Sequence, residues 1–257
     1  MPKPSPLFFV KVCMDLHWGF ASRYAQWSKS KDSFLIPPLT TFIGALAYGH
    51  ARLFSRPEEL DSVSYAEKIR ENLTSVNVKV TSPLWLYSDL SKIWWYRYRE
   101  KSAKPDAVAL GKVVKGSLEA PSFTVVYSLN EKGVEALGGE KALVASAASI
   151  TRVGSKEGIA SVREVSHGCT RPLNTAHGTT SYSLWKDLAE EVSGTFYTQR
   201  IVDYRVASIG DYSKAPARFH LYPYDAKEGR GTSIDVRIRS DRAAIYNVEG
   251  ELVVIEL

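Results

Sequence analysis

Apolar residues along the first two thirds of the chain fall into short blocks that are typical of strands. Each block is rich in β-branched and aromatic side chains and is bounded by turn-forming residues. The blocks predict strands over residues 7–16, 76–87, 121–130 and within 151–165. Pro83 interrupts the second block. Because proline cannot donate a ladder hydrogen bond, part of this strand is expected at a sheet edge.

Segments between these strands have helical character. Residues 39–54 form the best helix candidate, and Pro37 and Pro38 before it favour an extended entry followed by a helix start. A second, alanine-rich helix is expected over 138–150, and the acidic stretch 57–72 is expected to be a helical excursion on the surface. The order of strand, helix, strand, strand, helix, strand is that of ferredoxin-like and RNA-recognition folds, which place an antiparallel sheet under two helices.

The last third of the chain has a different pattern. Residues 166–200 are rich in Gly, Ser and Thr and contain one short helix candidate around 184–192. Five strand-like blocks follow, over residues 200–206, 217–224, 232–240, 243–248 and 251–257. We therefore expect an α+β protein, with a ferredoxin-like domain over 1–165 and a linker and smaller β-rich region over 166–257.

The composition is that of an ordinary globular protein, with 44% hydrophobic and 24% charged residues. The apolar runs are too short for a membrane span or a secretory signal. The only two cysteines, Cys13 and Cys169, favour a reducing cytoplasm, and a single bridge between them is the alternative.

The net charge of +5 is concentrated in residues 92–115. The cations of this segment are Lys92, Arg97, Arg99, Lys101, Lys104, Lys112 and Lys115. They stand against only Glu100 and Asp106, so the segment alone carries a charge of +5. Trp94 and Trp95 are interleaved with the cations, and single-stranded nucleic acid binding needs both kinds of side chain. The residue types leave two alternatives, RNA contact or a hairpin with solvated charges.

Two other segments could contact phosphate. Thr40 and Thr41 stand beside free backbone N–H groups at the start of the predicted helix, although an ordinary capped helix explains them as well. Residues 152–158 combine a glycine-permitted turn with two cations and a serine. This segment is not a P-loop, because it lacks the GK[ST] ending.

Catalytic patterns are weak in this sequence. His167, Cys169 and His177 form one cluster, but they lack the paired spacing of a zinc site. Metal-free RNA cleavage needs only a base, an acid and a cation. The candidates for these roles are His17, Tyr48 and Lys112. We predict no catalytic centre, no metal site and no cofactor.

Four blocks of the sequence together resemble a known family. They are HWGFASRY at 17–24, IPPLTTFIGALAYG at 36–49, APSFTVVY at 120–127 and ITRVGSKEGIASV at 150–162. Their order and spacing resemble the fifth CRISPR-associated (Cas) protein family. Its members belong to the repeat-associated mysterious protein (RAMP) superfamily and are subunits of the type I Cascade effector. The resemblance covers residues 7–165 and points to the archaeal subtype I-A.

The resemblance implies a ferredoxin-like domain with an inserted β-hairpin thumb, here residues 87–121. It also implies a subunit that binds the 5′ handle of the guide crRNA, caps the Cascade backbone subunits and contacts the large subunit. No membrane partner is expected. The positions implied for RNA contact are Arg23, Trp27, Lys29, Lys31, Thr40, Thr41, Lys92, Trp94, Trp95, Arg97, Arg99, Lys112, Lys115, Arg152, Ser155 and Lys156.

One subtype of the family uses its member to process CRISPR repeat RNA, but nothing in this sequence securely matches that nuclease triad. We therefore expect a non-catalytic RNA-binding subunit in antiviral defence. The alternative is a metal-independent endoribonuclease on the same fold. A metabolic ferredoxin-like enzyme is a third hypothesis.

Overall fold

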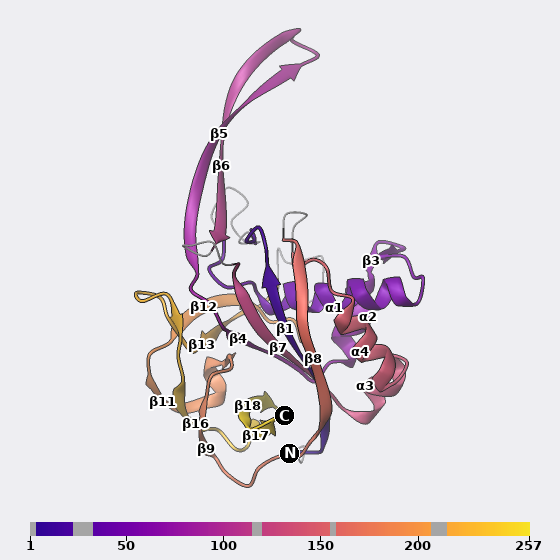
Figure 1. Cartoon of the computed structure of the whole chain (residues 1–257), viewed down its shortest axis with the longest axis vertical. Helices are drawn as coiled ribbons and strands as arrows, with labels where there is room; N and C mark the ends of the chain where they lie inside the picture. The colour runs from indigo at the N-terminus through magenta and orange to yellow at the C-terminus, as the bar shows by residue number, and fades with distance from the viewer. Residues whose placement is uncertain (1–3, 23–32, 115–119, 155–157, 207–214) are drawn as a thin grey trace.

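The computed structural model describes residues 4–22, 33–114, 120–154, 158–206 and 215–257, without the side chains of Leu60 and of residues 87–95, 97 and 104–114. Its centre is a four-stranded antiparallel sheet in the order β4–β7–β1–β8 (Figure 1). These strands are β4 (Ser75–Val80), β7 (Ser122–Leu129), β1 (Leu7–Leu16) and β8 (Ala160–Thr170).

Alternate residues of the central strands face two different layers. In β7, Phe123, Val125 and Tyr127 belong to the larger hydrophobic cluster, whereas Val126 belongs to a second cluster on the other side of the sheet. Phe9 of β1 lies in that second cluster too. Successive side chains of a strand point to opposite faces, so a strand buried on both faces is almost continuously apolar. This burial explains why β1 and β7 are conspicuous in the sequence.

Helices cover one face of this sheet (Figure 1). They are α1 (Leu39–Leu53), α2 (Tyr65–Asn72), α3 (Glu131–Ala136) and α4 (Glu140–Ala148). The Phe42 ring of α1 packs edge-on against Phe123, with 5.7 Å between the ring centroids. The Tyr127 hydroxyl donates a hydrogen bond of 2.9 Å to the Phe42 carbonyl. At Gly49, α1 approaches the backbone of Ser146 in α4 so closely that a Cβ atom would collide with it.

The predicted elements occur in the predicted order, as β1, α1, β4, β7, α4 and β8. Their boundaries differ in places. β4 ends at Val80, before Pro83, and lies at one edge of the sheet. The fourth strand starts only at Ala160 and continues past residue 165 to Thr170.

The acidic stretch 57–72 is helical only in its second half. Two short strands, β2 (Glu59–Leu60) and β3 (Val63–Ser64), pair with each other before α2 begins. The Ser64 side chain caps α2 by accepting a hydrogen bond from the backbone N–H of Ala66.

The C-terminal region is β-rich, as predicted, but the helix expected around 184–192 is wrong. That stretch is β10 (Leu184–Trp185), a 3-10 turn (Lys186–Leu188) and β11 (Ala189–Gly194). β11 pairs with a distant strand, so tertiary pairing outweighs local helix preference here. The other strands are β9 (His177–Thr180), β12 (Tyr197–Val202), β13 (Ala217–Tyr222), β14 (Tyr224–Asp225), β15 (Arg230–Gly231), β16 (Ile234–Ile238), β17 (Ala243–Val248) and β18 (Glu251–Glu256).

The hairpin β17–β18 packs on the face of the central sheet opposite the helices. Tyr246 and Ile255 of this hairpin share a buried cluster with Phe9 of β1. Leu184 and Tyr222 belong to the same larger cluster as the helix-facing side of the sheet. The two parts of the chain therefore bury their apolar residues together.

The two cysteines are free thiols. In the β1–β8 pairing, Cys13 lies opposite Glu164 and Cys169 lies opposite Phe8, so the alternative of a bridge between them is not realised. None of the helices in the described part of the chain combines the length and the apolar composition that a membrane crossing needs.

Candidate nucleic-acid interface

The segments that the sequence singled out for RNA contact start and end at one end of the central sheet. There the backbone N–H of Leu16, at the end of β1, bonds to the Pro121 carbonyl just before β7, at 2.8 Å. The N–H of His17 bonds to the Ile159 carbonyl just before β8, at 3.0 Å. The backbone N–H of Thr81, just after β4, bonds to the Ser122 carbonyl at 3.0 Å. All four strands of the sheet therefore meet their connecting segments at this end, which we call the sheet end.

The loop after β1 closes at the sheet end. Ser22 donates its backbone N–H to the Ser33 hydroxyl at 2.9 Å, and Phe34 donates its N–H to the Ser22 carbonyl at 2.8 Å. These bonds join the two sides of a loop that leads directly into α1. The loop residues predicted to contact RNA, which are Arg23, Trp27, Lys29 and Lys31, lie outside the described residues.

The start of α1 contacts the turn before β8. The helix begins after Pro38, whose ring has no polar group for a side-chain cap, and Thr40 and Thr41 occupy its first turn. Gly154 has a positive φ of 80°, and a Cβ built on it would lie 3.2 Å from the Thr41 methyl carbon. The structure therefore brings Thr41 next to the turn that carries Arg152. Ser155 and Lys156 of the same turn lie outside the described residues.

A long two-stranded hairpin projects from the sheet end (Figure 1). It consists of β5 (Trp85–Arg97) and β6 (Ser102–Val114), inserted between β4 and β7, and is paired from Trp85–Val114 to Arg97–Ser102. The backbone of this hairpin carries Lys92, Trp94, Trp95, Arg97 and Lys112, while Lys115 lies outside the described residues. The described hairpin spans residues 85–114, and the insertion was expected over 87–121.

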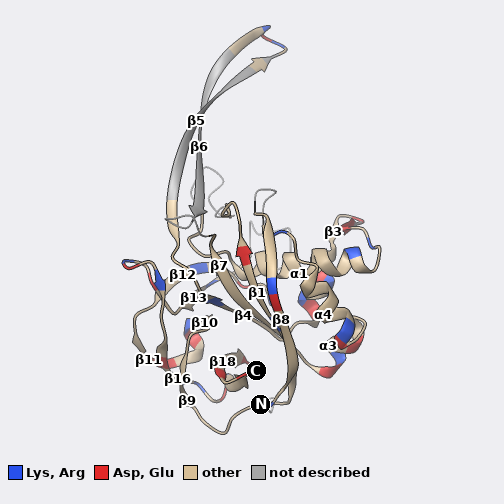
Figure 2. Ribbon diagram, viewed as in Figure 1, with Lys and Arg blue, Asp and Glu red and all other residues tan. Residues whose placement is uncertain are grey.

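The tip of the hairpin is polar and aromatic at once. Arg99, Glu100 and Lys101 are exposed there, and Figure 2 shows charge of both signs at the tip. The rings of Tyr96 and Tyr98 pack edge-to-face with 5.0 Å between centroids, and Tyr98 is 85% exposed. An exposed aromatic pair beside cations can contact either a base or a protein surface.

Exposed apolar side chains at the sheet end escaped the sequence prediction. Trp18, directly after β1, is 65% exposed. Ile159 before β8, and Trp85 and Leu86 at the base of the hairpin, are exposed as well. The sequence signal was the position of Trp18 between a strand and a basic loop, where no core periodicity needs a tryptophan. Exposed aromatic rings are side chains on which bases can stack.

The opposite face of the sheet is closed by the C-terminal hairpin. Lys11 of β1 forms ion pairs with Glu249 at 3.0 Å and with Glu251 at 3.5 Å, and Lys79 of β4 also pairs with Glu251. The Tyr182 hydroxyl donates to Glu251 at 2.9 Å. The lysines of this face are therefore neutralised within the protein.

The three side chains considered for metal-free RNA cleavage have different contacts. His17 shares a hydrogen bond of 2.7 Å with the Ser161 hydroxyl, through its Nε2 atom. Tyr48 of α1 lies against Arg52 and Arg152. The backbone of Lys112 pairs with Tyr87 in the hairpin. Among the described residues, no three His, Cys, Asp or Glu side chains are grouped so that they could hold a metal ion; His167 and His177 lie in different sheets.

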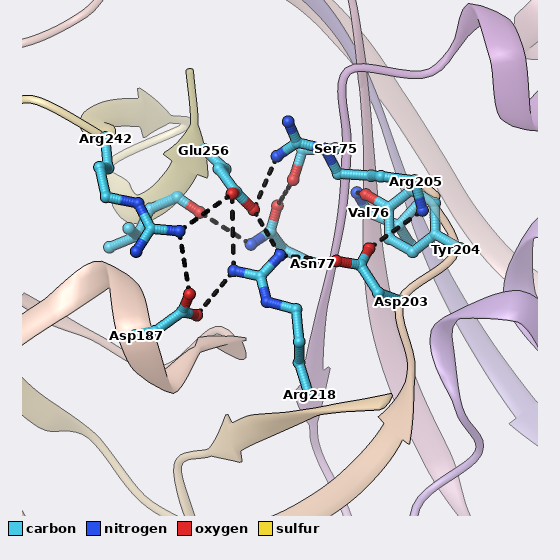
Figure 3. A network of polar contacts seen from close by, with 11 residues as sticks. Ser75, Val76, Asn77, Asp187, Asp203, Tyr204, Arg205, Arg218, Arg242 and Glu256 are labelled. Atoms are coloured by element: carbon cyan, nitrogen blue, oxygen red, sulfur yellow. Dashed lines mark hydrogen bonds and ion pairs between the residues drawn. The ribbon is translucent and has the colours of Figure 1, made fainter. Parts of the chain in front are cut away.

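A second polar cluster lies among the C-terminal strands, next to β4 (Figure 3). Arg218 of β13 contacts Asp187 at 2.6 Å, Asp203 at 2.8 Å and Glu256 at 3.1 Å. Its guanidinium carbon also lies 4.6 Å from the centroid of the Trp185 ring. Burial acts to raise the pKa of Asp187, but hydrogen bonds from Arg218 and Arg242 outweigh it and hold that pKa below its usual value. The charges compensate one another, so we assign this Arg218 cluster to structure rather than to ligand binding.

No protein-family model matches the chain. Two curated proteins of Saccharolobus solfataricus match nearly all of it. "CRISPR-associated protein Cas5 3" is 26% identical, and "CRISPR system aCascade subunit Cas5 1" is 27% identical. Each alignment covers 96% of this chain and 99% of the relative. This chain is a Cas5 homologue. The family resemblance drawn from four sequence blocks is thereby confirmed, and the alignments extend it into the C-terminal region.

The fold of this Cas5 homologue also resembles a solved structure. The chain superposes on the crystal structure of a CRISPR protein from Archaeoglobus fulgidus with a TM-score of 0.65 and 21% identity, covering 97% of this chain and 100% of the other. This likeness confirms the α+β architecture. The assignment of individual residues to RNA contact stays a prediction.

Proposed function

We propose that this Cas5 homologue is a non-catalytic subunit of a Cascade-type CRISPR complex that binds the 5′ handle of the guide crRNA. The observation that carries the proposal is the convergence of the loop after β1, the start of α1, the turn before β8 and the base of the hairpin at one sheet end. The name of one full-length relative, an aCascade subunit, supports the same assignment and the archaeal subtype I-A.

The proposal includes a ferredoxin-like domain with a thumb. The order β1, α1, β4, β7, α4, β8 along the chain, with β4–β7–β1–β8 in the sheet, fits the split βαβ topology. The hairpin β5–β6 would be the thumb. A connection of this length between neighbouring strands is far longer than a compact sheet requires, which supports a role outside its own domain.

The RNA is proposed to follow the sheet end and the hairpin rather than the face of the sheet. RNA-recognition modules stack bases on an open sheet face. In this protein β17–β18 covers that face, and Lys11 is paired with Glu249 and Glu251. The sheet end instead offers Trp18 and Trp85 with exposed rings. The hairpin would also bind the terminal backbone subunit, and the protein would contact the large subunit. The complex would act in the cytoplasm.

Guide capture tests this function directly. Co-expression with neighbouring Cascade subunits and a CRISPR array should copurify a guide-length RNA with the protein. Replacing residues 85–114 by a short Gly-Ser turn should leave a folded monomer, because β4 pairs with β7 along its whole length without the hairpin. The same replacement should abolish copurification of the guide and the backbone subunit. Retained assembly would refute the thumb assignment, and loss of the folded monomer would show that the hairpin belongs to the core.

An endoribonuclease is the second candidate, because one described segment contacts two of the cleavage candidates. His17 contacts Ser161, and Tyr48 contacts Arg152. A β-bridge pairs Arg152 with Ile159, two residues before Ser161, so both contacts are made by one folded segment. We nevertheless propose that the protein does not cut RNA. Incubation with repeat RNA in excess chelator should leave the RNA intact. A discrete product that disappears in His17→Ala or Tyr48→Phe would establish the nuclease instead.

A further inference from the structure

One tyrosine of α1 holds two arginines from different parts of the chain. The guanidinium carbons of Arg52 and Arg152 lie 5.6 and 5.2 Å from the centroid of the Tyr48 ring. Arg52 also donates a hydrogen bond of 2.8 Å from Nη1 to the Tyr48 hydroxyl. Arg52 lies one turn further along α1, whereas Arg152 comes from the segment before β8. Only the folded chain assembles this group, which we call the Tyr48 cluster.

The two cations of the Tyr48 cluster lack a carboxylate partner within the part of the chain that the structure describes. Other arginines differ in this respect, since Arg218 contacts three carboxylates and Arg70 contacts two. Two positive groups beside one ring raise the local potential and attract an anion. The pKa of Tyr48 is lowered, chiefly by the hydrogen bond from Arg52 with a contribution from the charge of Arg152, which reflects the same potential.

We propose that Tyr48, Arg52 and Arg152 form a binding site for one phosphodiester group of RNA. Guanidinium forks match phosphate oxygens geometrically, and cation–π contact with Tyr48 holds both guanidinium groups beside one ring before the ligand arrives. The inference rests on the proposed function, because it takes the guide RNA to be the source of the anion. It deepens that function by extending the interface from the sheet end along α1, since Arg152 adjoins the turn whose Gly154 contacts Thr41.

The affinity for handle RNA as a function of salt tests the site. Arg52→Gln and Arg152→Gln should each weaken binding about 3- to 10-fold, and each should reduce the slope of log K against log salt by up to about 0.7, the value for the one phosphate on a single strand that the two arginines share. Arg56→Gln is the matched control, because it removes one exposed charge just after α1. A slope that stays at the wild-type value in both variants, or that falls equally in the control, would overturn the proposal.

A second measurement separates this site from the proposed function. Arginine Nε–H resonances, assigned with the same variants, are followed by NMR during titration with inorganic phosphate. Shifts at Arg52 and Arg152 but not at Arg56 are expected. RNA binding by the wild type without these shifts and without an effect of the variants rejects the site and leaves the function standing. Phosphate shifts in a wild type that binds no RNA reject both RNA as the ligand and the proposed function.

Thermal unfolding shows whether the variants remain folded. If Arg152→Gln unfolds at the assay temperature, Arg152→Lys replaces it, since lysine keeps the charge and removes the fork. The lysine variant should retain most of the salt slope and lose part of the affinity. Wild-type affinity in the lysine variant would overturn the role of the guanidinium fork.

Discussion

Replacing Arg218 by methionine should destabilise the protein strongly. Methionine keeps an apolar side chain over the Trp185 ring but removes the cation that faces Asp187, Asp203 and Glu256. The exposed fractions are 22% for the Arg218 side chain, 6% for Asp203 and 14% for Glu256, so two carboxylates would lose a partner in a largely dry setting.

The size of the effect follows from what remains after the substitution. Breaking a buried ion pair by removing one partner costs about 3–5 kcal/mol. Here Glu256 keeps Arg205 at 2.7 Å, and Asp187 keeps Arg242 at 2.9 Å. Asp203 keeps the backbone N–H of Arg205. We therefore expect a loss of about 2–4 kcal/mol in the free energy of unfolding, below the full cost because of partial exposure and residual partners.

Urea unfolding monitored by tryptophan fluorescence measures this loss at pH 7. Arg230→Met is the control, because the Arg230–Glu228 pair is exposed on both sides and should cost less than about 0.5 kcal/mol. The loss in Arg218→Met should shrink as the pH falls towards 3. The pKa of Asp187 is lower in the folded protein than the value of about 3.9 in the unfolded chain. Its ionised form therefore stabilises the wild type above about pH 3.9, and this stabilisation is lost as the pH falls through the folded pKa. A loss below about 0.5 kcal/mol at pH 7 would refute the reasoning.

Three further predictions concern single residues. His220 is fully buried and its ring nitrogens lack partners among the described residues, and burial lowers its pKa to about 3. The wild type should therefore lose stability as the pH falls from about 6.5 to 3, and this loss should be smaller in His220→Phe. Urea midpoints measured against pH test this, and the same profile in both proteins would contradict it. Arg52→Gln should raise the pKa of Tyr48 towards its ordinary value, seen by ultraviolet titration of the phenol against Tyr48→Phe, and an identical titration curve would remove Arg52 as the cause. Gly154→Val should lower stability by about 1–3 kcal/mol, because a β-branched residue is strained at a positive φ, and should weaken RNA binding by displacing Thr41; normal binding would place the RNA away from this turn.

Local patterns in the sequence determined much of the central domain. β1 and β7 are buried on both faces, so their apolar residues are nearly continuous. α1 is recognisable from the proline at its start and from apolar residues at helical spacing. The charge and aromatic content of residues 92–115 set this segment apart, the family resemblance implied an inserted hairpin over it, and the structure has the hairpin β5–β6 there. These features depend on neighbours within a few residues, which is why the sequence alone reveals them.

Other features depend on contacts between residues far apart in the chain, and only the tertiary structure decided them. Residues 184–192 have a helix-compatible composition, yet β11, which begins at Ala189, pairs with β16, so the stretch forms strands and a 3-10 turn. The closure of one sheet face by Glu249 and Glu251 against Lys11 joins residues about 240 positions apart, and no local period predicts such a pairing. The Tyr48 cluster arises in the same way, because Arg152 reaches Tyr48 only when the turn before β8 lies against α1. Hydrophobic periodicity specifies which face of an element is buried, but which distant charges meet is fixed by the packing of those faces against one another.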